Sequence, residues 1–132
     1  MILRIDQNSS DPIYVQIRAR IIEAIAEGSL QPGDALPSVR KLAADLGINL
    51  HTVNKAYAVL RDDGYIVMCG RSGAFIADPA ALRSGADGAG LLQLEQSLRS
   101  LALEVKARGG SFEDFVGCVS CVAHEVFDRE GK

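Results

Sequence analysis

Amide, imidazole and basic side chains gather in one short stretch of this sequence, between residues 38 and 61. Asn54 carries an amide that can pair with adenine through two hydrogen bonds, and Arg40 and Lys55 carry charges suited to phosphate or guanine. His51, one of only two histidines, lies three residues before Asn54. Each of these residues alone is most often an ordinary surface residue, so it is their combination that indicates binding to a nucleic acid.

Two short helices separated by a tight turn are predicted to position these side chains. Ser38 can cap the first helix, and Gly47 supplies the left-handed residue that ends it. Asn49 can cap the second helix, which Gly64 ends. The apolar residues expected in the core recur at three- and four-residue spacing; they are Val39, Leu42, Ala43, Leu46, Val53, Tyr57 and Leu60. With that face buried, the first turn of the second helix points mostly outward.

A small hairpin is predicted after the second helix. Residues 65 to 69 and 74 to 77 are strand-like, and residues 70 to 73 form a tight loop between them. The glycines of this loop are not expected to hold phosphate, because a strand and not a helix follows them. A helix-turn-helix with a hairpin behind it is a winged helix, a fold that lays its second helix in the major groove of DNA.

A specific set of residues occurs in a set order and spacing between positions 11 and 78. These residues are Pro12, Ile13, Tyr14, Pro32, Gly33, Leu36, Pro37, Ser38, Val39, Arg40, Thr52, Val53, Ala56, Tyr57, Gly64 and Gly73. The pattern resembles the GntR family of bacterial transcription regulators, and the short helical tail resembles the YtrA branch of that family. Leu50 and Ala74 depart from the arginine and threonine that are common in the family, which bears on the DNA sequence preferred and not on the fold.

The resemblance implies that the helix-turn-helix and the loop of the hairpin contact an operator. Arg40 is expected at DNA by resemblance, while His51 and Asn54 are expected at base edges. Thr52 fits a DNA contact and the start of its own helix equally well. The complete set of expected DNA-binding residues is Ser38, Arg40, Asn49, Leu50, His51, Thr52, Asn54, Lys55, Arg71, Ser72 and Gly73. No catalytic residue and no cofactor are expected.

The overall composition limits the class of protein. With 48% apolar residues the chain can bury a core, and its net charge of −3 argues against coating nucleic acid through bulk positive charge. Residues 38 to 61 nonetheless hold four basic residues and one acid, which confines phosphate attraction to one face. No signal peptide and no membrane span are expected, and three cysteines, an odd number, give no disulfide framework. We therefore expect a protein of the reduced cytoplasm.

Residues 1 to 10 are expected to form a short extended arm before the first helix. Asp11 is predicted to cap that helix with Pro12 at its first position. Ile17 and Ile21 lie on its predicted core face. Residues 1 to 78 are therefore assigned to one winged helix-turn-helix domain, which is mainly α with a small β wing.

A second unit is expected after a glycine-rich linker at residues 79 to 90. Residues 91 to 132 are predicted to form two helices that break at Gly109 and Gly110, with Ser111 capping the second. Each helix carries an apolar stripe that this hairpin cannot bury alone. The residues expected at the resulting interface are Leu91, Leu94, Leu98, Leu101, Val105, Phe112, Phe115, Val119, Val122 and Val126. Docking on a second copy would give a two-fold homodimer; the alternative is a hairpin that folds back on its own winged helix.

Cys118, Cys121 and His124 follow one another at three-residue steps and form the one tempting metal pattern. Thiolates and an imidazole suit zinc, with a fourth ligand from Glu125 or from a second chain. Structural zinc sites normally take ligands from two separate elements, so packing of small cysteines in the helical interface is the favoured interpretation. No metal site is expected.

The sequence therefore predicts a homodimeric, sequence-specific transcription regulator, by resemblance a repressor, that binds an inverted-repeat operator in double-stranded DNA. A protein-interaction module with the same fold is the main alternative, and an enzyme is the weaker one. The basic residues Arg40, Lys55 and Arg71 favour DNA over protein as the partner. An effector pocket inside a single helical hairpin is not expected, because two helices enclose too little volume.

Overall fold

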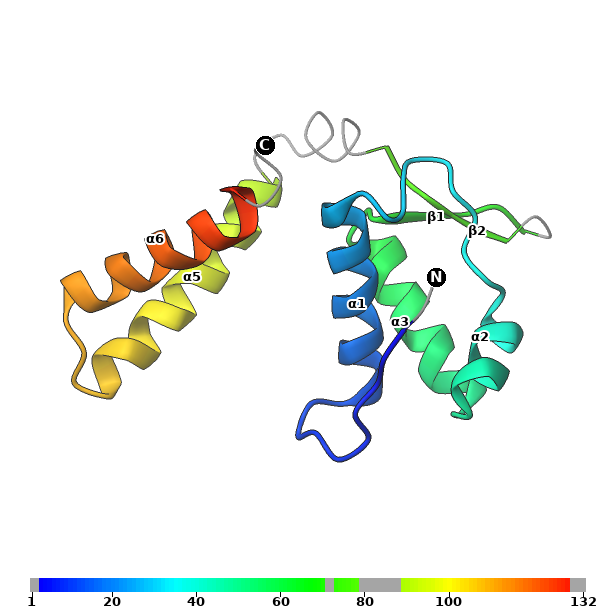
Figure 1. Cartoon of the computed structure of the whole chain (residues 1–132), viewed down its shortest axis with the longest axis horizontal. Coiled ribbons are helices and arrows are strands. Elements are labelled where there is room, and N and C mark those ends of the chain that lie inside the picture. Colours follow the sequence, from blue (N-terminus) through cyan, green and yellow to red (C-terminus); the bar gives the residue numbers. More distant parts are fainter. Residues whose placement is uncertain (1–2, 71–72, 79–88, 129–132) are drawn as a thin grey trace. The chain divides into compact units, whose positions relative to one another are not determined.

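The computed structural model describes residues 3 to 70, 73 to 78 and 89 to 128, with the backbone alone for residues 89 to 92. The chain divides into two compact units, Met1–Gly85 and Ala86–Lys132. The elements are α1 (Ile13–Glu27), α2 (Val39–Leu46), α3 (Leu50–Asp62), β1 (Ile66–Met68) and β2 (Ala74–Ile76) in the first unit, and α5 (Ala89–Ala107) and α6 (Phe112–Asp128) in the second (Figure 1). The predicted winged helix-turn-helix followed by a helical hairpin is thereby confirmed.

Helix α1 begins one residue later than predicted. Its N-cap is Pro12, which makes no side-chain capping bond, so the prediction of Asp11 as the cap is wrong. The side chain of Gln16 gives the reason, since its Nε2 donates to the carbonyls of Asp6 (2.9 Å) and Asp11 (3.0 Å) and its Oε1 accepts from the Asp6 N–H (2.8 Å). An N-cap carbonyl should accept the first intrahelical bond. The Asp11 carbonyl is occupied by Gln16 instead, and the Pro12 carbonyl accepts from the N–H groups of Val15 and Gln16.

The predicted caps of the helix-turn-helix are confirmed. Ser38 Oγ accepts from the Lys41 N–H at 3.1 Å, and Asn49 Oδ1 accepts from the His51 N–H at 2.7 Å. Gly47 ends α2 with a φ of 68°, a left-handed conformation that glycine adopts without steric cost. Each cap depends on residues two or three apart, which is why the sequence pattern identifies both helix starts.

The wing strands pair antiparallel with Val67 opposite Phe75. The segment at residues 33 to 36 lies along the other edge of β2. There the Leu36 N–H donates to the Ala74 carbonyl, and the Ile76 N–H donates to the Asp34 carbonyl, each at 2.9 Å. The hairpin is therefore bonded directly to the segment that leads into α2.

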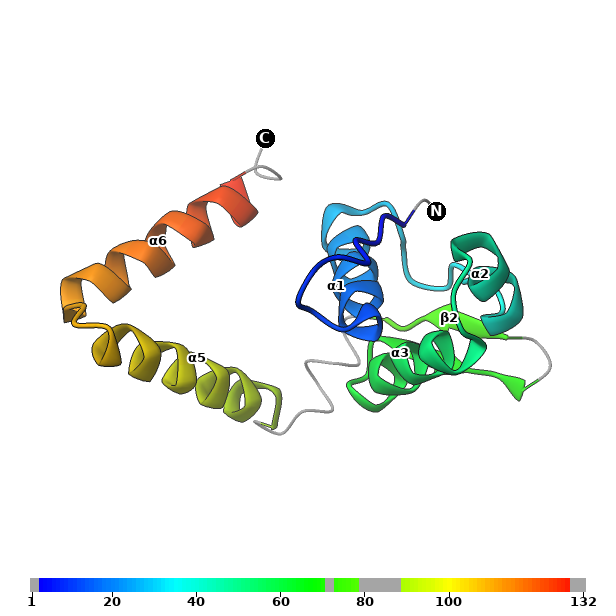
Figure 2. The same cartoon turned by 90° about the horizontal axis from the view of Figure 1, so that it is seen from below.

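Helices α1 and α3 lie side by side in both views and enclose the core of the first unit (Figures 1 and 2). The core residues are Ile17, Ile21, Leu30, Leu36, Leu42, Ala43, Val53, Ala56, Tyr57, Leu60, Ile66, Ala74 and Ile76. At the edge of this core the Arg18 guanidinium bonds Asp63 at 3.0 Å and lies 5.8 Å from the ring centroid of Tyr65. These contacts join α1 to the end of α3, so that the exposed face of α3 stands on a fixed base.

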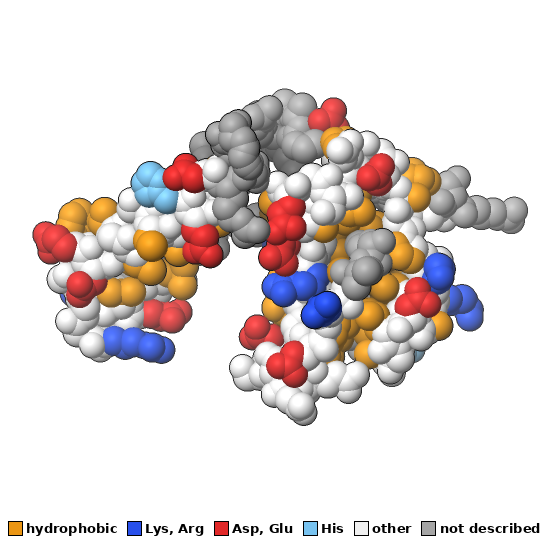
Figure 3. All heavy atoms as spheres, viewed as in Figure 1, with side chains coloured by type: hydrophobic (Ala, Val, Ile, Leu, Met, Phe, Trp, Pro, Cys, Tyr) orange, Lys and Arg blue, Asp and Glu red, His pale blue; other side chains and the backbone are white. Residues whose placement is uncertain are grey.

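In the second unit, Ser111 and Asp114 begin α6 with two reciprocal hydrogen bonds. Ser111 Oγ accepts from the Asp114 N–H at 3.0 Å, and Asp114 Oδ2 accepts from the Ser111 N–H at 2.8 Å, which confirms the predicted cap. Helices α5 and α6 diverge from the turn that joins them (Figure 2), and α6 has no buried residue among those described. Apolar side chains consequently reach the surface of this unit (Figure 3).

Candidate nucleic-acid interface

The first two turns of α3 present polar side chains on the face opposite the core. Val53, Ala56 and Leu60 of this helix are fully buried, and this fixes which way the helix is turned about its axis. His51 and Asn54 are consequently exposed, as the sequence predicts. An amide and an imidazole on an outward helical face have the donors and acceptors needed to read base edges in a groove.

The remaining predicted residues at the start of α3 have differing environments. Leu50 is 38% exposed, so a leucine side chain stands on the surface beside the polar ones. Thr52 is half-buried. The oxygen of Asn49 is engaged in capping the helix, and the Oγ of Ser38 likewise caps α2, so both residues fix backbone N–H groups as well as lying at the surface.

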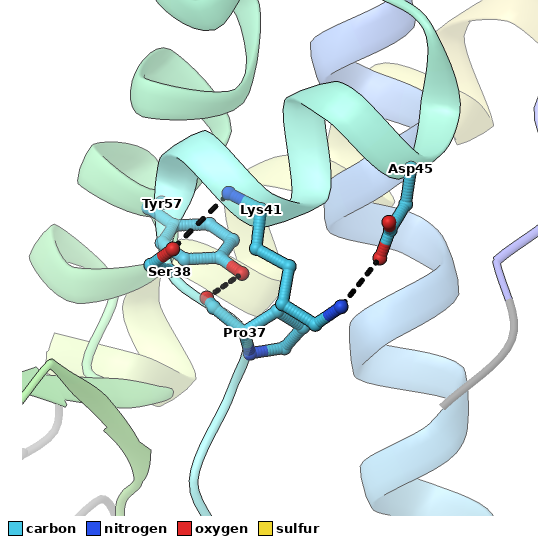
Figure 4. A network of polar contacts seen from close by, with 5 residues as sticks. All are labelled: Pro37, Ser38, Lys41, Asp45 and Tyr57. Carbon is cyan, nitrogen blue, oxygen red and sulfur yellow. Dashed lines mark hydrogen bonds and ion pairs between the residues drawn. The ribbon is translucent and has the colours of Figure 1, made fainter.

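Helix α2 is held against α3 by a hydrogen bond from Tyr57 to the turn before α2. The Tyr57 hydroxyl donates to the Pro37 carbonyl at 2.8 Å, next to the capping bond of Ser38 (Figure 4). Tyr57 is 1% exposed, and burial raises the pKa of its phenol well above the usual range. The bond fixes the position of Arg40, which follows Ser38 by two residues and is exposed.

The four basic residues counted between positions 38 and 61 are not equivalent. Lys41 pairs with Asp45 at 3.4 Å (Figure 4), and Arg61 pairs with Asp62 at 3.1 Å. Arg40 makes no ion pair within the described part of the chain. Of these four residues, Arg40 and Lys55 are therefore the ones whose positive charge is available to an external phosphate.

Lys55 makes a contact with α1 that the sequence pattern does not predict. Its ammonium lies 4.2 Å from the ring centroid of Tyr14, in the first turn of α1. Tyr14 is half-buried and packs against the core cluster. The two residues are far apart in the sequence, so no local pattern could have linked them.

The tip of the wing lies partly outside the described residues. Arg71 and Ser72, both predicted to contact DNA, are among the residues not described. Gly73 is described, with a φ of 98°, and its carbonyl accepts from the Cys69 N–H at 2.8 Å. A φ of this size favours glycine, which is consistent with a tight turn at this place.

The residues predicted for an interface between helices are largely exposed in the single chain. Leu94, Leu101, Val119, Val122 and Val126 are each between 41% and 53% exposed. Leu98 is 36% exposed and Phe112 is 76% exposed, whereas Val105 and Phe115 are half-buried. The side chain of Leu91 is not among those that the structure describes. Leu103, which falls outside the predicted stripe, is also 61% exposed.

Cys118, Cys121 and His124 lie on α6 and are all exposed. His124 Nδ1 is 2.8 Å from Asp128 Oδ2, one helical turn further on. No three His, Cys, Asp or Glu side chains in the described ranges are arranged to hold a metal ion. No helix within those ranges is long and apolar enough to cross a membrane.

Comparison with known proteins gives a family match over the winged helix. The model of the gntR family of bacterial regulatory proteins matches residues 13 to 76. The HTH-type transcriptional repressor YtrA of Bacillus subtilis is 42% identical over 78 residues. That match spans 59% of this chain and 60% of the Bacillus protein, so this chain matches about three-fifths of that relative's length.

Solved structures extend the similarity to both units. YtrA from Sulfolobus acidocaldarius, described as a GntR-family transcription factor, is 38% identical with a TM-score of 0.55, covering 94% of this chain and 98% of that one. A transcriptional antiterminator from Listeria monocytogenes is 26% identical with a TM-score of 0.78, covering 96% and 92%. The DNA-binding domain of AraR in complex with an operator is 25% identical with a TM-score of 0.50, covering 58% and 94%.

Proposed function

Because the chain belongs to the YtrA-like branch of the GntR family of bacterial regulatory proteins, we propose that it is a transcription regulator that binds an operator in double-stranded DNA. The observation that carries this proposal is the exposed face of α3, where His51, Asn54 and Lys55 stand opposite a fully buried face. A winged helix places this helix in the major groove. The operator complex of the similar AraR domain supports DNA as the partner.

Arg40 and Lys55 favour DNA over a protein partner. Both are exposed, and neither charge is paired with a carboxylate in the described part of the chain. Unpaired cations beside a groove-reading helix attract phosphates, which supply most of the affinity for any duplex. A surface evolved for protein contact would instead be expected to expose an apolar centre.

The second unit supports a two-fold homodimer. Helices α5 and α6 leave apolar side chains exposed on a single chain, and burying them against a second copy removes that surface from water. Residues 1 to 78 would then read one half-site each, residues 79 to 90 would link the units, and residues 91 to 132 would hold the dimer. The division of the chain near Gly85 is consistent with this assignment.

The direction of regulation is proposed to be repression, in the cytoplasm, with no enzymatic activity. The Bacillus relative is named a repressor, whereas the Listeria structure is named an antiterminator. An operator placed between promoter and reporter distinguishes these outcomes. Repression predicts a fall in reporter output when the chain is expressed.

Selection of bound duplexes from a random DNA pool tests the proposal directly. We expect an inverted repeat to be enriched, and we expect a duplex with one half-site to bind far more weakly than the full repeat. The variant Asn54→Ala, which keeps every charge, serves as the matched control and should alter the enriched sequence. If the pool yields no enriched sequence and all duplexes bind equally, the proposed function is wrong.

A further inference from the structure

The contact between Tyr14 and Lys55 joins the DNA-facing helix to α1. The Lys55 ammonium lies 4.2 Å from the centroid of the Tyr14 ring, well within the range of about 6 Å over which a ring face attracts a cation. Tyr14 lies in the first turn of α1, and Lys55 lies in the second turn of α3. The contact is therefore made between two separate elements.

Both partners stand on rigid supports. Tyr14 is half-buried and packs against the core cluster, one turn before the fully buried Ile17. Lys55 is followed directly by Ala56, which is also fully buried. The ring thus has a fixed place, while the long lysine side chain has several rotatable bonds, and the contact with the ring favours one of its arrangements.

An aromatic ring and a carboxylate bind a cation in different ways. Lys41 and Arg61 are held by Asp45 and Asp62, whose negative charges offset theirs. A tyrosine ring attracts an ammonium through its quadrupole and leaves the full positive charge in place. Only one side of the ammonium can face the ring, so its remaining N–H groups stay free to donate to a second partner.

We propose that Tyr14 is a positioning residue that holds the Lys55 ammonium ready to receive a backbone phosphate of the duplex. This inference rests on the proposed function and assigns the chemistry of one contact within it. Holding a flexible side chain before binding reduces the entropy lost on binding, and so raises affinity without adding a new contact. Because a phosphate carries no base identity, the gain applies to every DNA sequence alike.

Four full-length chains test this role on the selected operator: wild type, Tyr14→Leu, Lys55→Met, and the double variant. We expect Tyr14→Leu to weaken binding about two- to five-fold per half-site, the range typical of a cation–ring contact at an exposed site. In the Lys55→Met background the same change should have no further effect, because the ring then has no ammonium to hold. An equal loss in both backgrounds would show a merely structural role for Tyr14 and overturn the proposal.

Tyr14→Phe tests whether the ring or the hydroxyl of Tyr14 is responsible for the effect on binding. This variant keeps the ring face, so we expect binding within about two-fold of wild type. A loss as large as that of Tyr14→Leu would assign the effect to the hydroxyl and overturn the proposal. Thermal unfolding of each variant shows whether a loss reflects damage to the core instead.

A measurement without DNA distinguishes this inference from the proposed function. In the free protein, ring-current effects should move the NMR signals of the Lys55 Cε protons upfield, and Tyr14→Leu should remove that shift. Absence of the shift from wild type would overturn this inference while leaving operator binding untouched. Failure of wild type to bind any duplex would overturn the proposed function and this inference together.

Discussion

The hydroxyl of Tyr57 in α3 donates a hydrogen bond of 2.8 Å to the carbonyl of Pro37, two residues before α2 begins. Tyr57 is 1% exposed, so this bond lies at the inner side of the helix-turn-helix. It connects the helix that presents Asn54 to the turn that positions Arg40. The angle between α2 and α3 therefore depends in part on one buried phenol.

Tyr57→Phe should lower the free energy of unfolding by about 1 kcal/mol, the net value of an ordinary hydrogen bond. The ring is kept, so packing should change little. Denaturant unfolding followed by circular dichroism measures the difference. A variant as stable as wild type would show that the bond contributes nothing to the fold.

The same residue should make stability depend on alkaline pH. Burial raises the pKa of Tyr57 above its usual value of 10.0, so the folded state favours the neutral phenol. This contribution is fully present below pH 10 and is lost as rising pH ionises the phenol in the unfolded chain. Wild type should therefore lose more stability than Tyr57→Phe above pH 10. Parallel pH dependences for the two proteins would contradict this.

Asn54→Ala and Lys55→Ala should weaken operator binding in different ways. Loss of the Asn54 amide should cost about 1–3 kcal/mol on the best operator and relax preference at one base pair per half-site. Loss of the Lys55 charge should weaken all sequences alike and reduce the salt slope by about one unit per contact. Binding to matched and mismatched duplexes across salt concentrations measures both effects.

Arg61→Ala is the matched control for charge. It removes one positive charge from the last turn of the same helix, where Arg61 already pairs with Asp62. Its effect on the salt slope should be much smaller than that of Lys55→Ala. Equal, sequence-blind losses for Asn54→Ala and Lys55→Ala would mean that α3 is turned differently in its groove.

Leu101→Glu should separate the proposed dimer into single chains. Leu101 is 51% exposed in the single chain and belongs to the predicted interface stripe. A charge buried there would oppose association. Ser100→Glu places the same charge at an exposed position about 100° around α5 from Leu101, away from the predicted interface stripe, and should leave the dimer intact. Sedimentation of both variants gives the answer, and a Leu101→Glu protein that remains dimeric would place the interface elsewhere.

Purified protein should contain no stoichiometric zinc. Cys118 and Cys121 are exposed on one helix, and His124 is engaged with Asp128. Structural zinc usually needs four ligands brought together from separate elements. Elemental analysis that finds about one zinc per chain or per dimer would reverse this expectation.

Three helix starts of this protein could be predicted from the sequence because the capping interactions that define them are local. Ser38, Asn49 and Ser111 each bond a backbone N–H two or three residues ahead, so residue type and spacing contain the whole interaction. The same local reasoning was wrong at Asp11. There the side chain of Gln16 bonds the Asp11 carbonyl and the arm at Asp6, and helix α1 begins later.

The candidate site divides in the same way. Helical periodicity alone predicts that His51 and Asn54 point outward, because a helix that buries Val53 and Leu60 on one face leaves the opposite face in solvent. What holds Lys55 was decided by tertiary structure, since the Tyr14 ring comes from another helix. The ion pairs of Lys41 with Asp45 and of Arg61 with Asp62, by contrast, join residues only four and one apart, so sequence spacing alone could have indicated them. Contacts between residues distant in the chain depend on how α1 packs against α3, and no pattern within either helix contains that information.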